Sequence, residues 1–208
     1  MKFLRILVAL LLIGGVCLTG RAVYLHAKAQ LASVLIRRAW RESARLGELR
    51  PPWPWADTHP VARLRIPRLH YDEIVLEGAT PRTMAFGPAR LFSGAGLGQP
   101  GNLELAGHRT SWFRPLEAVE LGDAIEVQWY DARRHELRER TYTVSTIRVV
   151  TPDDVTLLAP TLDDALTLIT CYPFGRSPRS PQRFMVRALP AGPSHLTEIS
   201  AARERTRL

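Results

Sequence analysis

The stretch DALTLITCYPFG, residues 164–175, combines a well-marked strand with a reactive side chain. Its apolar and β-branched residues from Ala165 onward are typical of a buried strand. Tyr172-Pro173 follows, and because proline has no N–H to donate to a neighbouring strand, the strand is expected to end there. Cys171 therefore lies at the end of a rigid element, where a thiol can reach an open edge. The alternative is a buried cysteine that acts only as a small hydrophobic residue.

Short alternating segments separated by turn residues continue on both sides of this strand. A period of two is clearest in VARLRIPRL (61–69) and in RERTYTVSTIRVV (138–150). Together with the strand in residues 164–175, they belong to a set of seven segments. Seven short strands with turns between them predict a β-barrel or a β-sandwich. The other members of the set are residues 72–78, 101–110, 123–131 and 183–190. Within this part of the chain, short helices are expected near Thr83–Phe86, Ser111–Val119 and Asp153–Leu158.

The first sixty residues have a different composition from the rest. Ile6–Leu25 is apolar and long enough to cross a bilayer, with Arg21 near the interface, so residues 1–25 are predicted to form an uncleaved membrane anchor. A cleaved signal peptide is the alternative. Residues 26–50 are predicted to form a stalk helix with an apolar stripe among basic side chains. Gly47 and the prolines that follow end this helix, and residues 51–60 are a Pro/Trp-rich linker.

The positive charge of the chain is concentrated at its beginning. Residues 1–50 hold nine Lys or Arg against two Asp or Glu, whereas residues 51–208 hold 19 against 18. A nucleic-acid partner would require the positive charge on the folded domain itself, so none is expected. We expect one β domain over residues 61–190 and a polar C-terminal tail over residues 191–208.

A reactive thiol needs a base or a positively charged neighbour. Among the six histidines, His108 is the best candidate because LELAGHRT (103–110) ends a predicted strand much as Cys171 does. Arg183 begins the next strand, and if the two strands pair, its guanidinium points to the same edge. A guanidinium can stabilise an oxyanion because it donates several fixed hydrogen bonds and stays positively charged. Arg187 is expected to point to the same face of the strand as Arg183, but it lies four residues further along.

Together these residues resemble the sortase family of cysteine transpeptidases. TLITC (167–171) matches the family's Thr-Leu-x-Thr-Cys signature, while LAGHR (105–109) and RFMV (183–186) resemble its histidine and arginine segments in the same order. The resemblance covers about residues 60–190. The segments WPWADTHPVARL (53–64), MAFGPARL (84–91) and PGNLELAGHRT (100–110) are similar to the Gram-negative, proteobacterial type.

The resemblance implies a closed eight-stranded β-barrel with the three site residues at one rim. It also implies cleavage of a secreted protein between Thr and Gly of a sorting motif similar to Leu-Pro-x-Thr-Gly. Cys171 would attack the Thr carbonyl and form a thioester, and His108 would protonate the leaving amine and deprotonate the incoming one. Arg183 would hydrogen-bond the substrate or the oxyanion, and Thr170 would help to position the sorting peptide. An amine acceptor, or water, would resolve the thioester.

The resemblance further implies an inner-membrane protein whose catalytic domain lies in the periplasm, although the charges that flank the anchor lean slightly the other way. No metal or cofactor is expected, because the acidic residues between the last predicted strands match no defined calcium loop; these are Asp153, Asp154, Asp163 and Asp164. Two other interpretations stay open. One is a membrane-tethered binding or assembly module with an inert Cys171, and the other is a cysteine peptidase that only hydrolyses.

Overall fold

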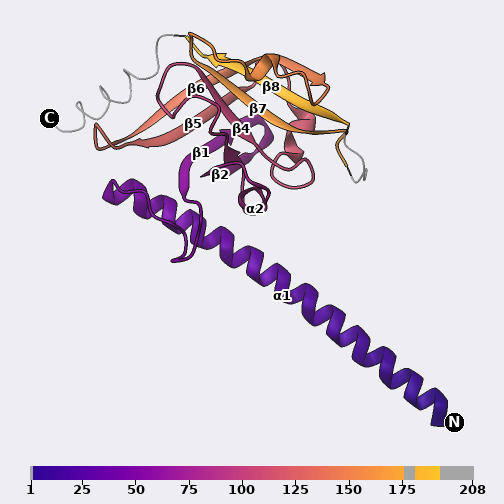
Figure 1. Ribbon diagram of the computed structural model, residues 1–208. Coiled ribbons are helices and arrows are strands. Elements are labelled where there is room, and N and C mark those ends of the chain that lie inside the picture. Colours follow the sequence, from indigo (N-terminus) through magenta and orange to yellow (C-terminus); the bar gives the residue numbers. More distant parts are fainter. Residues whose placement is uncertain (1, 176–180, 193–208) are drawn as a thin grey trace.

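Eight strands of the described residues close into a barrel, from which a long helix projects (Figure 1). The computed structural model describes residues 2–175 and 181–192. Neighbouring strands follow the order β1-β2-β3-β4-β7-β8-β6-β5, and β5 closes the ring against β1. The strands are β1 (Pro60–Ile66), β2 (Tyr71–Glu77), β3 (Ala89–Arg90), β4 (Asn102–Ala106), β5 (Ala124–Asp131), β6 (Glu136–Val150), β7 (Ala165–Tyr172) and β8 (Gln182–Pro190).

The barrel confirms the mainly β, eight-stranded fold expected from the sequence. Each of the seven predicted segments overlaps one of these strands, with bounds that differ by at most two residues on the side where the strand is longer. The eighth strand, β3, has only two residues, which is too short for any alternation to be recognised. Three of the connections carry the expected short helices, and a fourth helix, η1, follows β1. These helices are η1 (Pro67–Leu69), α2 (Pro81–Met84), η2 (Arg114–Ala118) and η3 (Thr156–Leu158).

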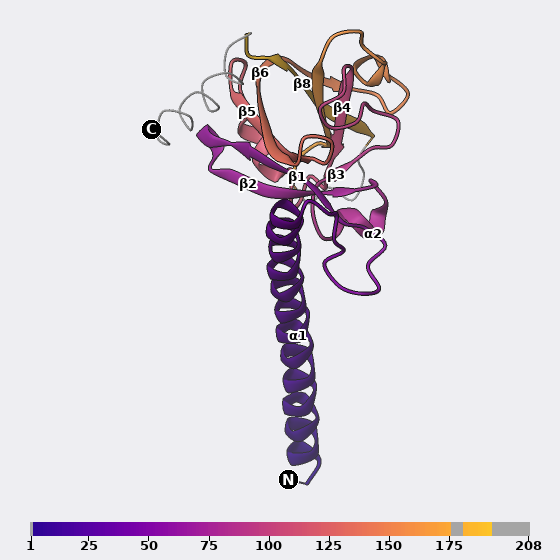
Figure 2. The ribbon, with the colours of Figure 1, turned by 90° about the vertical axis from the view of Figure 1, so that its left-hand side faces the viewer.

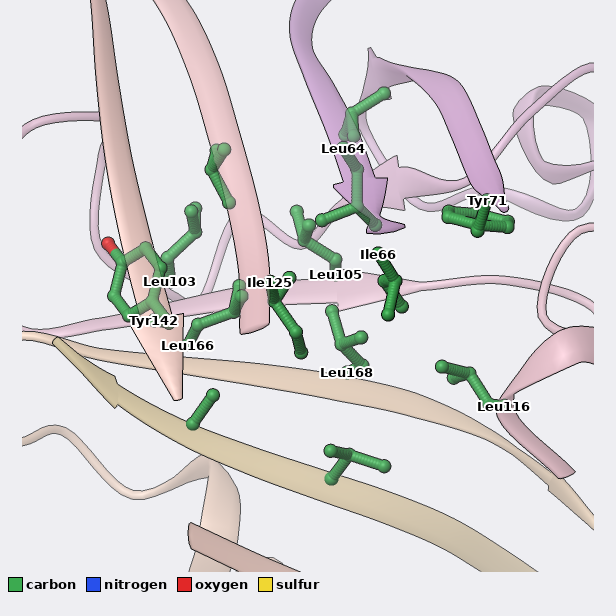
Figure 3. Close-up of a cluster of buried hydrophobic side chains, with 14 of the residues drawn as sticks. Leu64, Ile66, Tyr71, Leu103, Leu105, Leu116, Ile125, Tyr142, Leu166 and Leu168 are labelled. Atoms are coloured by element: carbon green, nitrogen blue, oxygen red, sulfur yellow. The ribbon is translucent and has the colours of Figure 1, made fainter. Parts of the chain in front are cut away.

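Alternation along the strands separates the inside of the barrel from its outside. β4 and β7 run parallel and in register, so that Leu103 pairs with Leu166 and Leu105 pairs with Leu168. All four leucines belong to the core cluster inside the barrel, where Figure 3 shows them beside Ile125. Successive residues of a strand point to opposite faces. The odd-numbered residues of β7 and the even-numbered residues of β4 therefore face the outside of the barrel.

A single helix, α1 (Lys2–Leu46), runs through both the expected anchor and the expected stalk. It ends at Leu46, four residues before the expected end of the stalk, and Gly47, which adopts a positive φ of 75°, follows it. Near this end, Ile36 and Trp40 are buried against Leu76 of β2 and its neighbours, while the N-terminal half extends away from the barrel (Figure 2).

Among the residues that the structure describes, no helix is both long and apolar enough to cross a membrane. The structure therefore gives no support to the transmembrane anchor expected at residues 1–25. At the other end of the chain, the expected polar tail lies outside the described residues from residue 193 onward.

The packing inside the barrel predicts the effect of a truncation on β4. Leu105 is fully buried, so Leu105→Ala should lower the free energy of unfolding by about 2–5 kcal/mol. Leu162, which is 96% exposed, provides a matched control, and Leu162→Ala should change stability by less than about 0.5 kcal/mol. Urea unfolding followed by circular dichroism measures both values. Equal losses in the two variants would contradict this assignment of the core.

Candidate active site

Cys171 and Arg183 lie side by side on the outer face of the barrel. Leu166 and Leu168 point inward, so Cys171 points outward at the end of β7. β7 and β8 are antiparallel, and Cys171 is the direct partner of Arg183. The Cβ atoms of such a pair are about 4.5–5.5 Å apart and their side chains share one face. The expected pairing of these two strands is confirmed, and it brings Arg183 beside Cys171 on the sheet, while the Arg183 guanidinium donates to the Gln182 carbonyl (3.1 Å).

Arg187, the other arginine considered from the sequence, lies at a different level of the sheet. Its partner on β7 is Thr167, four residues before Cys171. Four residues of extended chain span about 13 Å. Arg183, rather than Arg187, is therefore the arginine next to the thiol.

His108 approaches Cys171 from the opposite side, through β4. The parallel register of β4 and β7 ends with Ala106 opposite Ile169, and the Gly107 amide continues it by donating to the Ile169 carbonyl (3.2 Å). His108 lies two residues beyond the end of β4, so a continuation of this register would bring its backbone level with Cys171, in the line of a strand about 4.8 Å from β7. The His108 side chain is exposed and Cys171 is half-buried, so both are accessible from solvent.

Thr170 is brought to the same end of β7 but faces the other way. It alternates with Cys171 and is buried on the inner side, where its hydroxyl donates to the Gly107 carbonyl (2.7 Å). The bond ties the end of β7 to the residue directly before His108. The Thr170 hydroxyl thus contacts the His108 segment, on the face of β7 opposite to the Cys171 side chain.

Two residues that sequence reasoning missed shape the chain around His108. Phe113 is fully buried in the core, and its amide donates to the His108 carbonyl (3.0 Å). A Cβ on Gly107 would lie only 2.8 Å from the Phe113 ring, so the absence of a side chain at Gly107 allows this close approach. The glycine was visible in AGHR, but no local signal places Phe113 beneath it.

Arg109 is a third such residue, and it connects the two loops that flank the thiol. Its guanidinium donates to the Pro173 carbonyl (2.5 Å), two residues after Cys171. The segment that carries His108 is therefore linked to the chain that leaves β7. The cysteine and the histidine are held by bonds between their own neighbours, which preserves their relative positions.

The arrangement suits nucleophilic acyl transfer. A thiol can attack a carbonyl carbon, an accessible imidazole can move the proton, and a guanidinium can donate to the oxygen that becomes negative. Within residues 2–175 and 181–192, no three His, Cys, Asp or Glu side chains gather as a metal site would require. The described side chains that can carry chemistry here are those of His108, Cys171 and Arg183.

The contact between Gly107 and Phe113 predicts a sensitive position. Gly107→Ala should lower the free energy of unfolding by about 1–3 kcal/mol, because the added methyl group forces the buried ring to move. It should also shift the NMR signals of the His108 imidazole. Gly15→Ala is the matched control, since a Cβ there meets nothing within 4 Å and should not lower stability. A stable Gly107→Ala protein with unchanged His108 signals would contradict this account.

Comparison with known proteins agrees with the geometry. Residues 64–191, more than half of the chain, match the family model described as the sortase domain. Sortase D of Bacillus subtilis (strain 168) is 25% identical over 124 residues, which is 59% of this chain and 60% of that protein's length. The chain thus matches less than two thirds of this curated relative.

Solved structures show the same fold. A Clostridium perfringens sortase D5 transpeptidase has a TM-score of 0.61 at 20% identity, with 78% of this chain and 99% of that chain covered. Sortase C-1 of Actinomyces oris has a TM-score of 0.56 at 28% identity, with 64% and 74% covered. Because the sortase domain model matches more than half of the chain and the barrel has the fold of solved sortases, the chain belongs to the sortase family.

Proposed function

We propose that this chain is a cysteine transpeptidase that cleaves a sorting motif similar to Leu-Pro-x-Thr-Gly and transfers the new acyl group to an amine. The observation that supports the proposal most directly is the register of β4, β7 and β8, in which Arg183 pairs with Cys171 and β4 ends opposite Ile169, two residues before His108. Family membership supports the reaction class.

The first half of the reaction forms a thioester. The Cys171 sulfur, whose proton has passed to His108, attacks the Thr carbonyl carbon of the motif as a thiolate, the C–S bond forms, and the carbonyl electrons move to the oxygen. Arg183 donates hydrogen bonds to this oxyanion. The intermediate collapses as the C–N bond to Gly breaks, and the protonated His108 gives its proton to the leaving amine.

The second half transfers the acyl group to the acceptor. An amine attacks the thioester carbonyl, and His108 takes up a proton from the attacking nitrogen. The new C–N bond forms, the C–S bond breaks, and the Cys171 sulfur leaves with the electron pair. Water in place of the amine yields hydrolysis of the same intermediate, so the ratio of the two products measures how well an amine acceptor is used.

The bacterial type and the location are part of the proposal. The segments around residues 53–64, 84–91 and 100–110 support the Gram-negative type. We place the catalytic domain in the periplasm, at the inner membrane. The first half of α1 exposes large apolar side chains that water does not stabilise, among them Phe3, Leu4, Leu11, Leu12, Ile13, Val16 and Leu18. Protease accessibility of the domain in spheroplasts tests this location.

Substitutions at the three site residues test the reaction. Cys171→Ala should abolish turnover of a sorting-motif peptide with excess amine, because no nucleophile remains. His108→Ala and Arg183→Ala should each lower kcat/KM by about 10²–10⁴-fold, through loss of proton transfer and of oxyanion stabilisation. Mass spectrometry of the products measures transpeptidation and hydrolysis separately.

Arg148, an exposed arginine on β6, is the control for loss of a positive charge, and Arg148→Ala should retain turnover. Normal turnover in Arg183→Ala would remove Arg183 from the mechanism.

Thiol reactivity separates an enzyme from a binding module. With iodoacetamide at neutral pH, Cys171 should be alkylated faster than Cys17, because a catalytic thiol is activated by its neighbours. Cys17, a free and exposed cysteine on α1, is an internal control in the same molecule. Peptide mapping quantifies both sites. In denaturant the two rates should become similar, and equal rates in the folded protein would favour the module with an inert cysteine.

A further inference from the structure

One backbone carbonyl in the connection between β6 and β7 lies within hydrogen-bond distance of side chains from three strands of the barrel. The Leu157 oxygen, in η3, lies 2.9 Å from Asn102 Nδ2 on β4 and 2.6 Å from an Arg187 guanidinium nitrogen on β8. It also lies 3.1 Å from Thr167 Oγ1 on β7. Asn102 and Thr167 are buried, so this cluster holds the connection over residues 151–164 to the outer face of the sheet.

The protons of this cluster can be assigned. The Thr167 hydroxyl has one proton, and Asn102 Oδ1, at 2.7 Å, is the nearer of its two acceptors. The Asn102 amide then donates one proton to the Leu157 carbonyl and the other to Glu104 (3.4 Å). Arg187 fills the second lone pair of the Leu157 oxygen. Each group thus fixes the orientation of the next, and removing one leaves another buried polar atom unpaired.

Arg187 is an unusual residue in this position. Burial lowers the pKa of Arg187, an effect that the nearby Glu104 carboxylate opposes. Its Nε atom is buried and has no hydrogen-bond partner among the described residues. Placing a guanidinium here is costly, and this guanidinium donates to the Leu157 carbonyl. The burial of Arg187 is therefore better explained by its hydrogen bond to the Leu157 carbonyl than by a gain in packing.

The connection that this cluster holds lies next to the level of the sheet that carries Cys171 and Arg183. Leu157 and Leu158 pack with Ile169 of β7 and Met185 of β8, which form the level of the sheet between Thr167 and Cys171. Figure 2 shows the connection, in orange, beside β4 and β8. A peptide that reaches Cys171 along this face meets an apolar surface made by Leu158 and Ile169, both half-buried.

We propose that Asn102, Thr167 and Arg187 are positioning residues that hold residues 151–164 in place for binding of the acyl-donor peptide. Thr167 and Arg187 lie about 13 Å along the sheet from the thiol, and Asn102, which pairs with Ala165, lies about 20 Å away, so none of them touches the reacting atoms. The role rests on the proposed function, since it assumes a peptide that binds beside Cys171. It predicts that the cluster sets KM, whereas Cys171, His108 and Arg183 set kcat.

Two variants test the proposal in the full chain. Arg187→Met removes the guanidinium but keeps a long side chain, and Thr167→Val removes the hydroxyl with almost no change of shape. Each should raise KM for a sorting-motif peptide about tenfold or more, as expected for loss of a buried hydrogen bond, with kcat changed less than about threefold. Thr167→Ser, which keeps the hydroxyl, should have a KM close to that of the wild type. Arg63→Met, which breaks a half-buried ion pair with Asp72 on the β1–β2 side, is the matched control.

Hydrogen exchange provides a readout that does not depend on turnover. The Leu158 amide donates to the Val155 carbonyl (2.8 Å), so its exchange reports on the order of the connection. In Arg187→Met and Thr167→Val, exchange over residues 151–164 should rise about tenfold or more, while exchange in β1 and β2 stays as in the wild type.

The outcomes separate this inference from the proposed function. Unchanged exchange and unchanged KM in folded Thr167→Val would overturn the inference, as would an equal effect of Arg63→Met. A fall in kcat at constant KM would also overturn it. If Arg187→Met does not fold, Thr167→Val decides alone. A wild-type protein that turns over no sorting peptide would refute the proposed function, while the exchange rates would still show whether the cluster holds the connection.

Discussion

The register of β7 between β4 and β8 is the constraint on which the rest of the structure depends. Leu166 and Leu168 can face the barrel interior in only one of the two possible alternations, and the same alternation turns Cys171 outward. A slip of one residue would bury the thiol and expose the leucines. Core packing and catalytic geometry are thus two results of one pairing, so the free energy of burying the leucines also positions the nucleophile.

Contacts at the ends of β4 and β7 hold the loop that carries His108. Register alone brings His108 near Cys171, but His108 lies beyond the last paired residue of β4. The hydroxyl of Thr170 and the ring of Phe113 hold Gly107 from two sides, and Arg109 joins the same loop to Pro173. An exposed histidine is thereby placed by buried neighbours. This arrangement gives the imidazole access to solvent and substrate without freeing its backbone.

The outer face of β7 and β8 has three levels with different chemistry. Thr167 and Arg187 form a polar level, Ile169 and Met185 an apolar one, and Cys171 and Arg183 the reactive one. Each level is two residues from the next, which is the repeat of a strand. The polar level fixes the β6–β7 connection, the apolar level packs beneath it, and the reactive level is left accessible. Binding and chemistry are thus assigned to different residues of the same two strands.

The sequence by itself indicated seven of the eight strands and three of the four short helices, and it singled out His108, Cys171 and Arg183 as candidate reactive residues. These signals are local: alternation with a period of two, a proline that ends a strand, and a motif around Cys171. Only the tertiary structure decided that Thr170 faces the Gly107 carbonyl, that Phe113 lies under Gly107, and that three strands meet at the Leu157 carbonyl. These contacts join residues that are distant in the chain, and their partners are chosen by the closure of the barrel. No local pattern in the sequence contains that information.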